Sequence, residues 1–137
     1  MLFRSLAETN AALTTSGTLT SSDVDNPNNK FNAANLTGTY GSFSIDADGN
    51  WAFTANSAFN SLNVGDSVSD TFNVSSIDGT PSTVTVTING TNDAATVSSA
   101  SVALAETNAA LTTSGTLTSS DVDNPNNKFN AANLTGT

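Results

Sequence analysis

The stretch Val84-Thr85-Val86-Thr87-Ile88 decides the fold class, because every residue in it is β-branched. Its apolar side chains stand on even positions and its threonines on odd ones, which is the alternation of a strand with one buried face. Residues 70–76 show the same pattern, with Phe72 and Val74 on one face, and the turn-forming residues 77–82 connect the two segments. The sequence therefore predicts a β-hairpin at the end of the domain.

A second hairpin is predicted upstream, from residues 40–45 and 51–55 with Asp, Gly and Asn residues in the turn between them. Weaker strands are expected at residues 13–20, 30–36 and 97–104, and no segment has the apolar period of a helix. About seven short strands with frequent turns predict an all-β fold, an immunoglobulin-like or cadherin-like Greek-key β-sandwich. The core side chains expected from the second hairpin share one parity: Phe43, Ile45, Trp51, Phe53 and Ala55.

The chain contains a long internal repeat. Residues 6–39 recur without a change as residues 104–137, so the period is 98 residues. That length fits one sandwich per repeat and is too long for a solenoid unit. We expect residues 1–5 to be non-native or a residual first strand that is mostly missing or replaced, residues 6–93 to be one nearly complete module, and residues 94–137 to be the truncated N-terminal part of a second, identical repeat. This last segment contains one aromatic residue and is not expected to fold alone.

The composition excludes several classes of function. The net charge is -9 with only three basic residues, so the phosphate backbone of a nucleic acid would be repelled. The chain has no cysteine and no histidine, which removes disulfides, the common zinc sites and the usual general base. No nucleophile with an activating partner can be assembled, so we do not expect an enzyme. No apolar run approaches the roughly 20 residues that span a bilayer, so membrane insertion by this segment is not expected either.

The acidic residues are expected at the two ends of the sandwich, and none in the middle of a strand. Strands that alternate in direction return their turns to alternate ends, so each acid can be assigned to one end. One end collects Asp23, Asp25, Asp46, Asp48 and Asp78. The opposite end collects Glu8, Asp66, Asp70 and Asp93.

In a tandem array these two acidic ends would face each other. Carboxylates about 4 Å apart repel by roughly 1 kcal/mol in bulk water and by about 4 kcal/mol at an effective dielectric constant of 20. A divalent cation would relieve this repulsion, and calcium suits a joint of carboxylate, amide and carbonyl oxygens better than magnesium does. We therefore predict calcium between modules, with ligands Glu8, Asp66, Asp70, Asn92, Asp93, Asp121 and Asp123.

Asp23 and Asp25 are the matching pair at the other end of the module and would form half of such a site, empty or weak. An alternative stays open for every one of these acids. Asp and Asn are also favoured in turns because they form local hydrogen bonds and tolerate positive φ, with no metal involved.

Two stretches carry a resemblance to a known family. Gly65-Asp-Ser-Val-Ser-Asp-Thr-Phe-Asn-Val-Ser-Ser-Ile-Asp-Gly79 and Ser82-Thr-Val-Thr-Val-Thr-Ile-Asn-Gly-Thr-Asn-Asp93 resemble the VCBS repeat, and the segments around Glu8, Asp23 and Trp51 fit it as well. The chain also resembles, more distantly, cadherin-like bacterial domains with calcium between modules. Asn92-Asp93 matches the closing Asn-Asp of the VCBS family, but Ala94-Ala95 follows where relatives commonly place Ala-Pro.

This resemblance implies a structural spacer in a large, repetitive, extracellular or cell-surface bacterial adhesin of the RTX type. Such proteins are often exported by type I secretion and act in cell adhesion and biofilm. The implied partners are neighbouring repeats of the same chain, with surface glycans or other cells reached through other domains.

The alternative function is a carbohydrate-binding β-sandwich. Tyr40, Trp51 and Phe53 could form an aromatic platform for sugars if they were exposed. Trp51 and Phe53 share parity with Phe43 and Ile45, which favours a place in the core instead.

Overall fold

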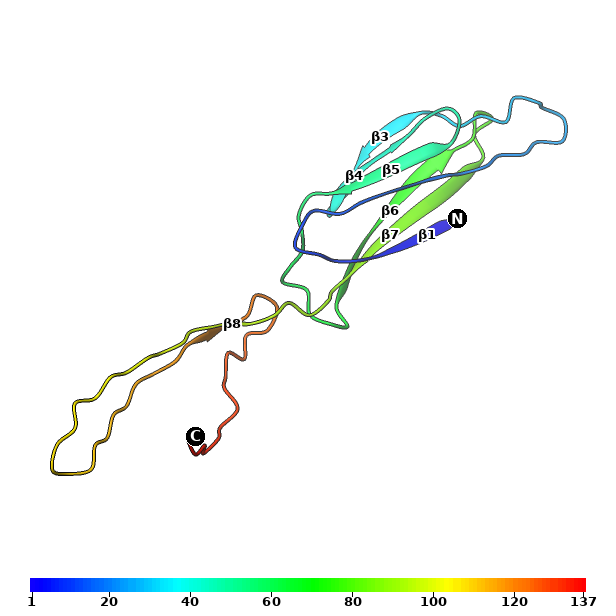
Figure 1. Cartoon of the computed structure of the whole chain (residues 1–137). Helices are drawn as coiled ribbons and strands as arrows, with labels where there is room; N and C mark the ends of the chain where they lie inside the picture. Colours follow the sequence, from blue (N-terminus) through cyan, green and yellow to red (C-terminus); the bar gives the residue numbers. More distant parts are fainter. The chain divides into compact units, whose positions relative to one another are not determined.

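The computed structural model describes all 137 residues, which divide into two compact units, Met1–Asn92 and Asp93–Thr137, called unit 1 and unit 2 below (Figure 1). Unit 1 is a sandwich of β-strands without helices, as the alternating sequence pattern predicts. Its strands are β1 (Leu2–Ala7), β2 (Thr14–Thr18), β3 (Ala34–Thr37), β4 (Gly41–Ile45), β5 (Asn50–Ala55), β6 (Ser67–Ser75) and β7 (Pro81–Asn89).

The strands form two sheets, one in the order β1-β7-β6 and the other in the order β2-β5-β4-β3. Both predicted hairpins are present, as the antiparallel pairs β4–β5 and β6–β7. β1 pairs with β7 in parallel, so the two strands run from Leu2 beside Val84 to Ala7 beside Asn89. The prediction of an all-β sandwich of about seven strands is therefore confirmed.

Aromatic side chains from both sheets fill the space between them. Phe43 of β4 stacks on Phe72 of β6, with ring centroids 4.7 Å apart and planes 12° apart. Phe43 also stacks on Trp51 of β5 at 5.8 Å. Such contacts stabilise beyond the area they bury. From β7, the apolar positions of the Val84 to Ile88 stretch are at most 1% exposed, so the decisive alternation in the sequence points into this core.

The segment before β3 changes sheets. The amide of Asn32 donates to the carbonyl of Ser75 at 3.0 Å, and the amide of Ile77 donates to the carbonyl of Lys30 at 2.8 Å, so this segment bonds to the end of β6. β3 itself pairs with β4 in the other sheet. The strand expected at residues 30–36 is therefore wrong as one continuous element, because its backbone hydrogen bonds go to two different sheets.

A first strand, β1, lies where the sequence placed it, and whether residues 1–5 are non-native or a residual strand stays a prediction. Leu2 and Leu6 of β1 pack against the core. Arg4 lies between them, and its guanidinium carbon is 5.6 Å from the centroid of the Trp51 ring. Two leucines, one on each side of Arg4, therefore anchor this short edge strand beside β7.

Unit 2 contains two short strands, β8 (Thr96–Val97) and β9 (Ser119–Ser120), which pair with each other. The strand expected at residues 97–104 ends at Val97, so most of that prediction is wrong. Phe129 is 49% exposed, whereas Phe31, its counterpart in the first copy, is 5% exposed. The chain holds two copies of residues 6–39 and one copy of residues 40–92. β2 and β3 form only in the first copy, where they pair with β5 and β4.

Removing the Phe43 ring tests the stacked core. We expect Phe43→Ala to lower the free energy of unfolding by about 3 to 5 kcal/mol, because truncating a buried Phe loses apolar burial and leaves a cavity. Chemical denaturation followed by Trp51 fluorescence measures the loss. Leu134→Ala is the control, since that side chain is 91% exposed and its removal should change little. Equal stability of the two variants would contradict the assignment of Phe43 to the core.

Candidate functional site

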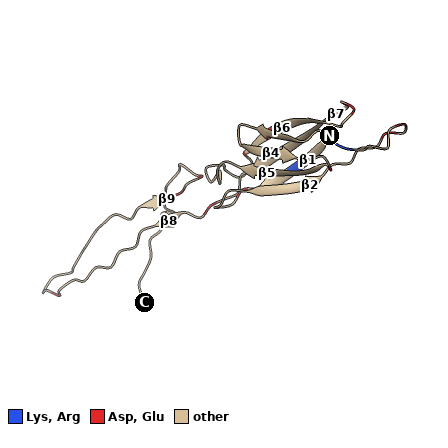
Figure 2. Cartoon of the chain, turned by 90° about the horizontal axis from the view of Figure 1, so that it is seen from above, with Lys and Arg blue, Asp and Glu red and all other residues tan.

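The acids of unit 1 lie mainly in loops beyond the ends of the strands, as Figure 2 shows in red. One exception corrects the sequence prediction. Asp70 is the fourth residue of β6 and pairs with Val86, so it lies inside a strand. β6 begins three residues earlier than expected, at Ser67, which places Asp70 within the ladder.

Asp70 holds the turn between β3 and β4. Its side chain is 8% exposed, and its two carboxylate oxygens accept hydrogen bonds from the amides of Thr39 at 2.9 Å and Tyr40 at 2.8 Å. The turn approaches so closely that a Cβ at Gly38 would lie 2.3 Å from Asp70 Oδ2. Both oxygens thus have amide partners within unit 1, which gives Asp70 a structural role. Its role as a calcium ligand stays a prediction.

Glu8 is the most deeply buried acid of unit 1, with 2% of its surface exposed. Its Oε1 accepts hydrogen bonds from the amide and the hydroxyl of Thr91, and the amide of Glu8 donates to the carbonyl of Asn89 at 2.8 Å. Its Oε2 is buried and has no hydrogen-bond partner. A buried carboxylate oxygen without a donor is costly, and such an atom is a natural place for a cation.

Asp66 and Glu8 lie in different loops, and both bond to the chain at the end of β7. The Oδ2 of Asp66 accepts from the amide of Asn63 at 3.2 Å, and its carbonyl accepts from the amide of Gly90 at 2.9 Å. Asp66 therefore closes the loop before β6 onto the segment after β7. Sequence reasoning placed Asp66 and Glu8 at this end but missed Thr91, because a threonine in a loop carries no pattern that marks it as a partner.

Three predicted ligands lie together in unit 2. The amide of Asp93 donates to Asp123 Oδ2 at 3.1 Å, and the amide of Asp123 donates to Asp121 Oδ1 at 3.3 Å. Interaction between the two carboxyl groups raises the pKa of Asp121 and lowers the pKa of Asp123. Asp123 is 3% exposed and its Oδ1 has no hydrogen-bond partner. No group of three or more Asp or Glu side chains within either unit is placed to hold a metal ion.

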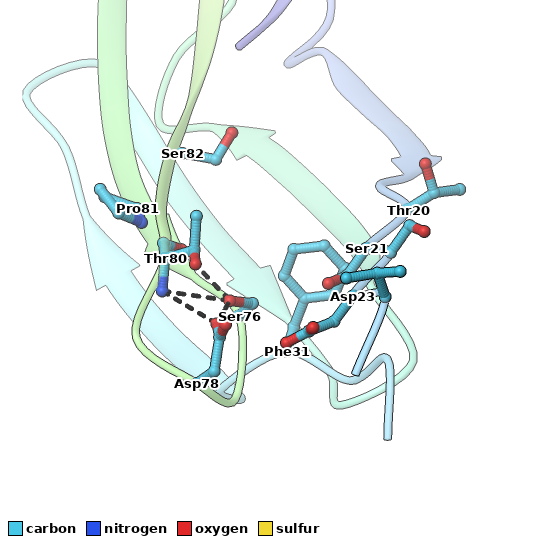
Figure 3. Close-up of a pocket in the computed structure, with 11 residues that line it drawn as sticks. Thr20, Ser21, Asp23, Phe31, Ser76, Asp78, Thr80, Pro81 and Ser82 are labelled. Atoms are coloured by element: carbon cyan, nitrogen blue, oxygen red, sulfur yellow. Dashed lines mark hydrogen bonds between the residues drawn. The ribbon is translucent and has the colours of Figure 1, made fainter. Parts of the chain in front are cut away.

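At the opposite end of unit 1, Asp23 and Asp78 line one cavity of about 660 Å³. Figure 3 shows Asp78 and Ser76 on one side of Phe31 and Asp23 on the other. The hydroxyl of Ser76 donates to Asp78, and this bond, with those from Thr80, holds the pKa of Asp78 below its ordinary value.

The predicted half site is therefore only partly assembled. Asp25 does not line the cavity, and its amide donates to Asp23 Oδ1 at 3.2 Å in a local turn. Asp48 at the same end forms an ion pair with Lys30. The acid that shares the cavity with Asp23 is Asp78. The sequence assigned the last hairpin turn, which contains Asp78, to this end of the sandwich, and that assignment could have identified the pair.

The aromatic side chains do not form a binding platform. Trp51 is 2% exposed and Phe53 is 1% exposed, so their faces are covered by the core. Tyr40 packs edge-on against Phe59 at a centroid distance of 5.8 Å. The geometry required by the carbohydrate-binding alternative is absent.

Comparison with protein families identifies a relationship for unit 1. The family described as the bacterial cadherin-like domain matches residues 4–90, which covers nearly all of unit 1. No curated protein matches the chain. The structure has no helix that could cross a lipid bilayer.

The structural role of Asp70 predicts a loss of stability that does not depend on metal. Asp70→Asn exchanges one carboxylate oxygen for an amide group that cannot accept a bond from a backbone amide. Because hydrogen bonds to charged groups contribute about 1.5 to 3 kcal/mol, we expect a decrease of about 2 kcal/mol in the free energy of unfolding. Denaturation in the presence of chelator should already show this decrease. A decrease seen only with calcium would contradict this role.

The lowered pKa of Asp78 predicts a pH effect of defined sign. Folding favours the charged form of Asp78, so this carboxylate adds to the free energy of unfolding at pH values above its unfolded pKa. That contribution to stability is lost as pH falls through the lower pKa of the folded state. We expect the melting temperature of the wild type to exceed that of Asp78→Asn near pH 6 and the two to converge below about pH 3.8. Thermal melts across this range measure the difference. A gap that widens in acid would contradict the sign.

Proposed function

The chain belongs to the bacterial cadherin-like domain family, and from this premise we propose that unit 1 is a structural spacer of the VCBS type in a large, repetitive bacterial adhesin. Domains of this family are typical of surface or secreted proteins and are usually non-catalytic. The spacer works in adhesion and biofilm by holding other domains away from the cell. Neighbouring repeats of the same chain are its partners.

One observation supports the spacer function above all. β1 and β7 run in parallel, so unit 1 begins near one end of its strands and ends at the other, beyond Asn89 (Figure 1). A module with this path passes the chain along its long axis. The paired sheets and stacked aromatic core between those points resist shortening, which is what an extender requires.

We further propose that calcium binds where one module follows another. Glu8 supports this at the end of unit 1, because its Oε2 is buried and without a donor. Asp121 and Asp123 support it in unit 2, because their carboxyl groups interact directly and Asp123 Oδ1 also lacks a donor. The proposed site takes its ligands from two consecutive modules of a tandem array. A bound calcium ion would supply positive charge to these oxygens.

The experiment compares the full chain with calcium and with chelator. Extracellular calcium sites bind at about 10⁻⁴ to 10⁻³ M, so at about 10 mM free calcium the expected stabilisation is about 1.4 to 2.7 kcal/mol per site. Thermal unfolding measures the stabilisation, and small-angle scattering measures whether the chain becomes longer and stiffer. An unchanged melting temperature together with an unchanged length would contradict the calcium proposal.

The repeat provides a matched control for the ligand assignment. Glu8→Gln keeps the acceptor for Thr91 but removes the charge, and we expect it to reduce the calcium-dependent stabilisation by more than half. Glu106→Gln makes the same change in the second copy, where the side chain is exposed, and should leave the stabilisation intact. Equal effects of the two variants would remove Glu8 from the site.

A further inference from the structure

Residues 13–37 and residues 111–135 are identical in sequence and differ in structure. In unit 1 this sequence forms β2 and β3 and buries Phe31 to 5% exposure. In unit 2 it leaves Phe129 49% exposed and Leu134 91% exposed. The second copy therefore presents apolar side chains for which a complementary surface exists within the same chain.

That surface consists of the edge of β5 that pairs with β2 and the edge of β4 that pairs with β3, together with the core between the sheets. β2 pairs with β5 from Thr14 opposite Thr54 to Thr18 opposite Asn50, and β3 pairs with β4. Residues 111–135 carry the same side chains in the same order, so they can make the same pairs.

The connection along the chain is long enough for such an exchange. Ala7 at the end of β1 lies beside Asn89 at the end of β7. From Ala7, the six residues 8–13 lead to the first residue of β2. From Asn89, the 22 residues 90–111 precede Thr112, which is the counterpart of Thr14. More residues are therefore available to span the distance from the end of β1 and β7 to the start of β2. β1 and its pairing with β7 need not change.

We propose that residues 111–135 exchange with residues 13–37 for the same place on β4 and β5, as a second, less populated arrangement of the chain. The first arrangement is favoured because it keeps the turn between β3 and β4, which Asp70 binds, continuous in the chain. The second copy is a better competitor than another molecule, because a tethered segment reaches an effective concentration of about millimolar. This proposal does not depend on the spacer function or on calcium.

Disulfide trapping tests the exchange, since the chain has no cysteine of its own. The amide of Ala55 donates to the carbonyl of Leu13, which makes the next pair, Thr14 and Thr54, a non-hydrogen-bonded one. Such pairs have Cα atoms about 4.5 Å apart, which suits a disulfide. The variant Thr54→Cys/Thr112→Cys should therefore form an intramolecular disulfide in the monomer. Thr71→Cys/Thr112→Cys is the mismatched control, because Thr71 is exposed on the other sheet.

The same substitution in each copy shifts the exchange in opposite directions. Added to the trapping pair, Phe31→Ala should raise the population of the second arrangement about 100-fold or more, because Phe129 then supplies the ring that the core requires. Phe129→Ala should reduce trapping to the level of the mismatched control. Non-reducing mass spectrometry measures the disulfide, and thermal melting of the Phe31→Ala chain should remain cooperative.

Three results would overturn the proposal. The first is equal trapping in the Phe31→Ala and Phe129→Ala variants. The second is a disulfide that forms only between two molecules, which would mean that a second chain is the partner. The third is a Phe31→Ala chain without cooperative melting, since the second copy would then have failed to replace the first.

Discussion

The structure depends on a layer of stacked aromatic rings between two sheets. Phe43 contacts Phe72 across the sandwich and Trp51 within its own sheet, and Phe53 closes the layer against Phe72 at a centroid distance of 6.0 Å. All four rings come from the part of the chain that occurs once, residues 40–92. The repeated part adds one buried ring, Phe31. The strands that carry the core therefore decide where the repeated sequence can fold, and they do so through packing rather than local propensity.

The apolar core also explains why the two buried acids of unit 1, Asp70 and Glu8, need hydrogen-bond partners for their carboxylates. An apolar interior accepts a carboxylate only where backbone amides or a cation compensate it. Asp70 is compensated by two amides of one turn and is therefore part of the fold. Glu8 is compensated at one oxygen only. The two buried acids thus differ in the number of amides that reach each carboxylate oxygen.

The sequence predicted the hairpins β4–β5 and β6–β7 well, because an apolar face with period two identifies both the strand and its buried side. It predicted the start of β3 poorly and could not decide how much of the first strand residues 1–5 keep. The segment around Phe31 bonds to both sheets, and β1 carries Arg4 on the side of its leucines, so neither shows a continuous pattern. For the acids, strand order predicted which end each would reach. It could not predict that Asp70 lies within a ladder or that Asp78 faces Asp23, since both depend on where strands begin and on turn geometry.

Identical repeats raise the question of why each segment pairs with its own module. Loop entropy contributes little: Thr14 and its counterpart Thr112 are separated from Thr54 by 40 and 58 residues, which changes the closure cost by about 0.3 kcal/mol in a flexible chain. Side chains contribute nothing to the choice, because the two copies are the same. What remains is continuity at the turn between β3 and β4, where Thr39 and Tyr40 are neighbours in sequence and both donate to Asp70. A segment from the other copy can place Thr137 where Thr39 stands, but Thr137 is not bonded to Tyr40, so the turn must be assembled from two segments that are not joined there. The buried carboxylate of Asp70 therefore does more than close a turn, because it makes correct pairing depend on which segment is covalently joined to β4.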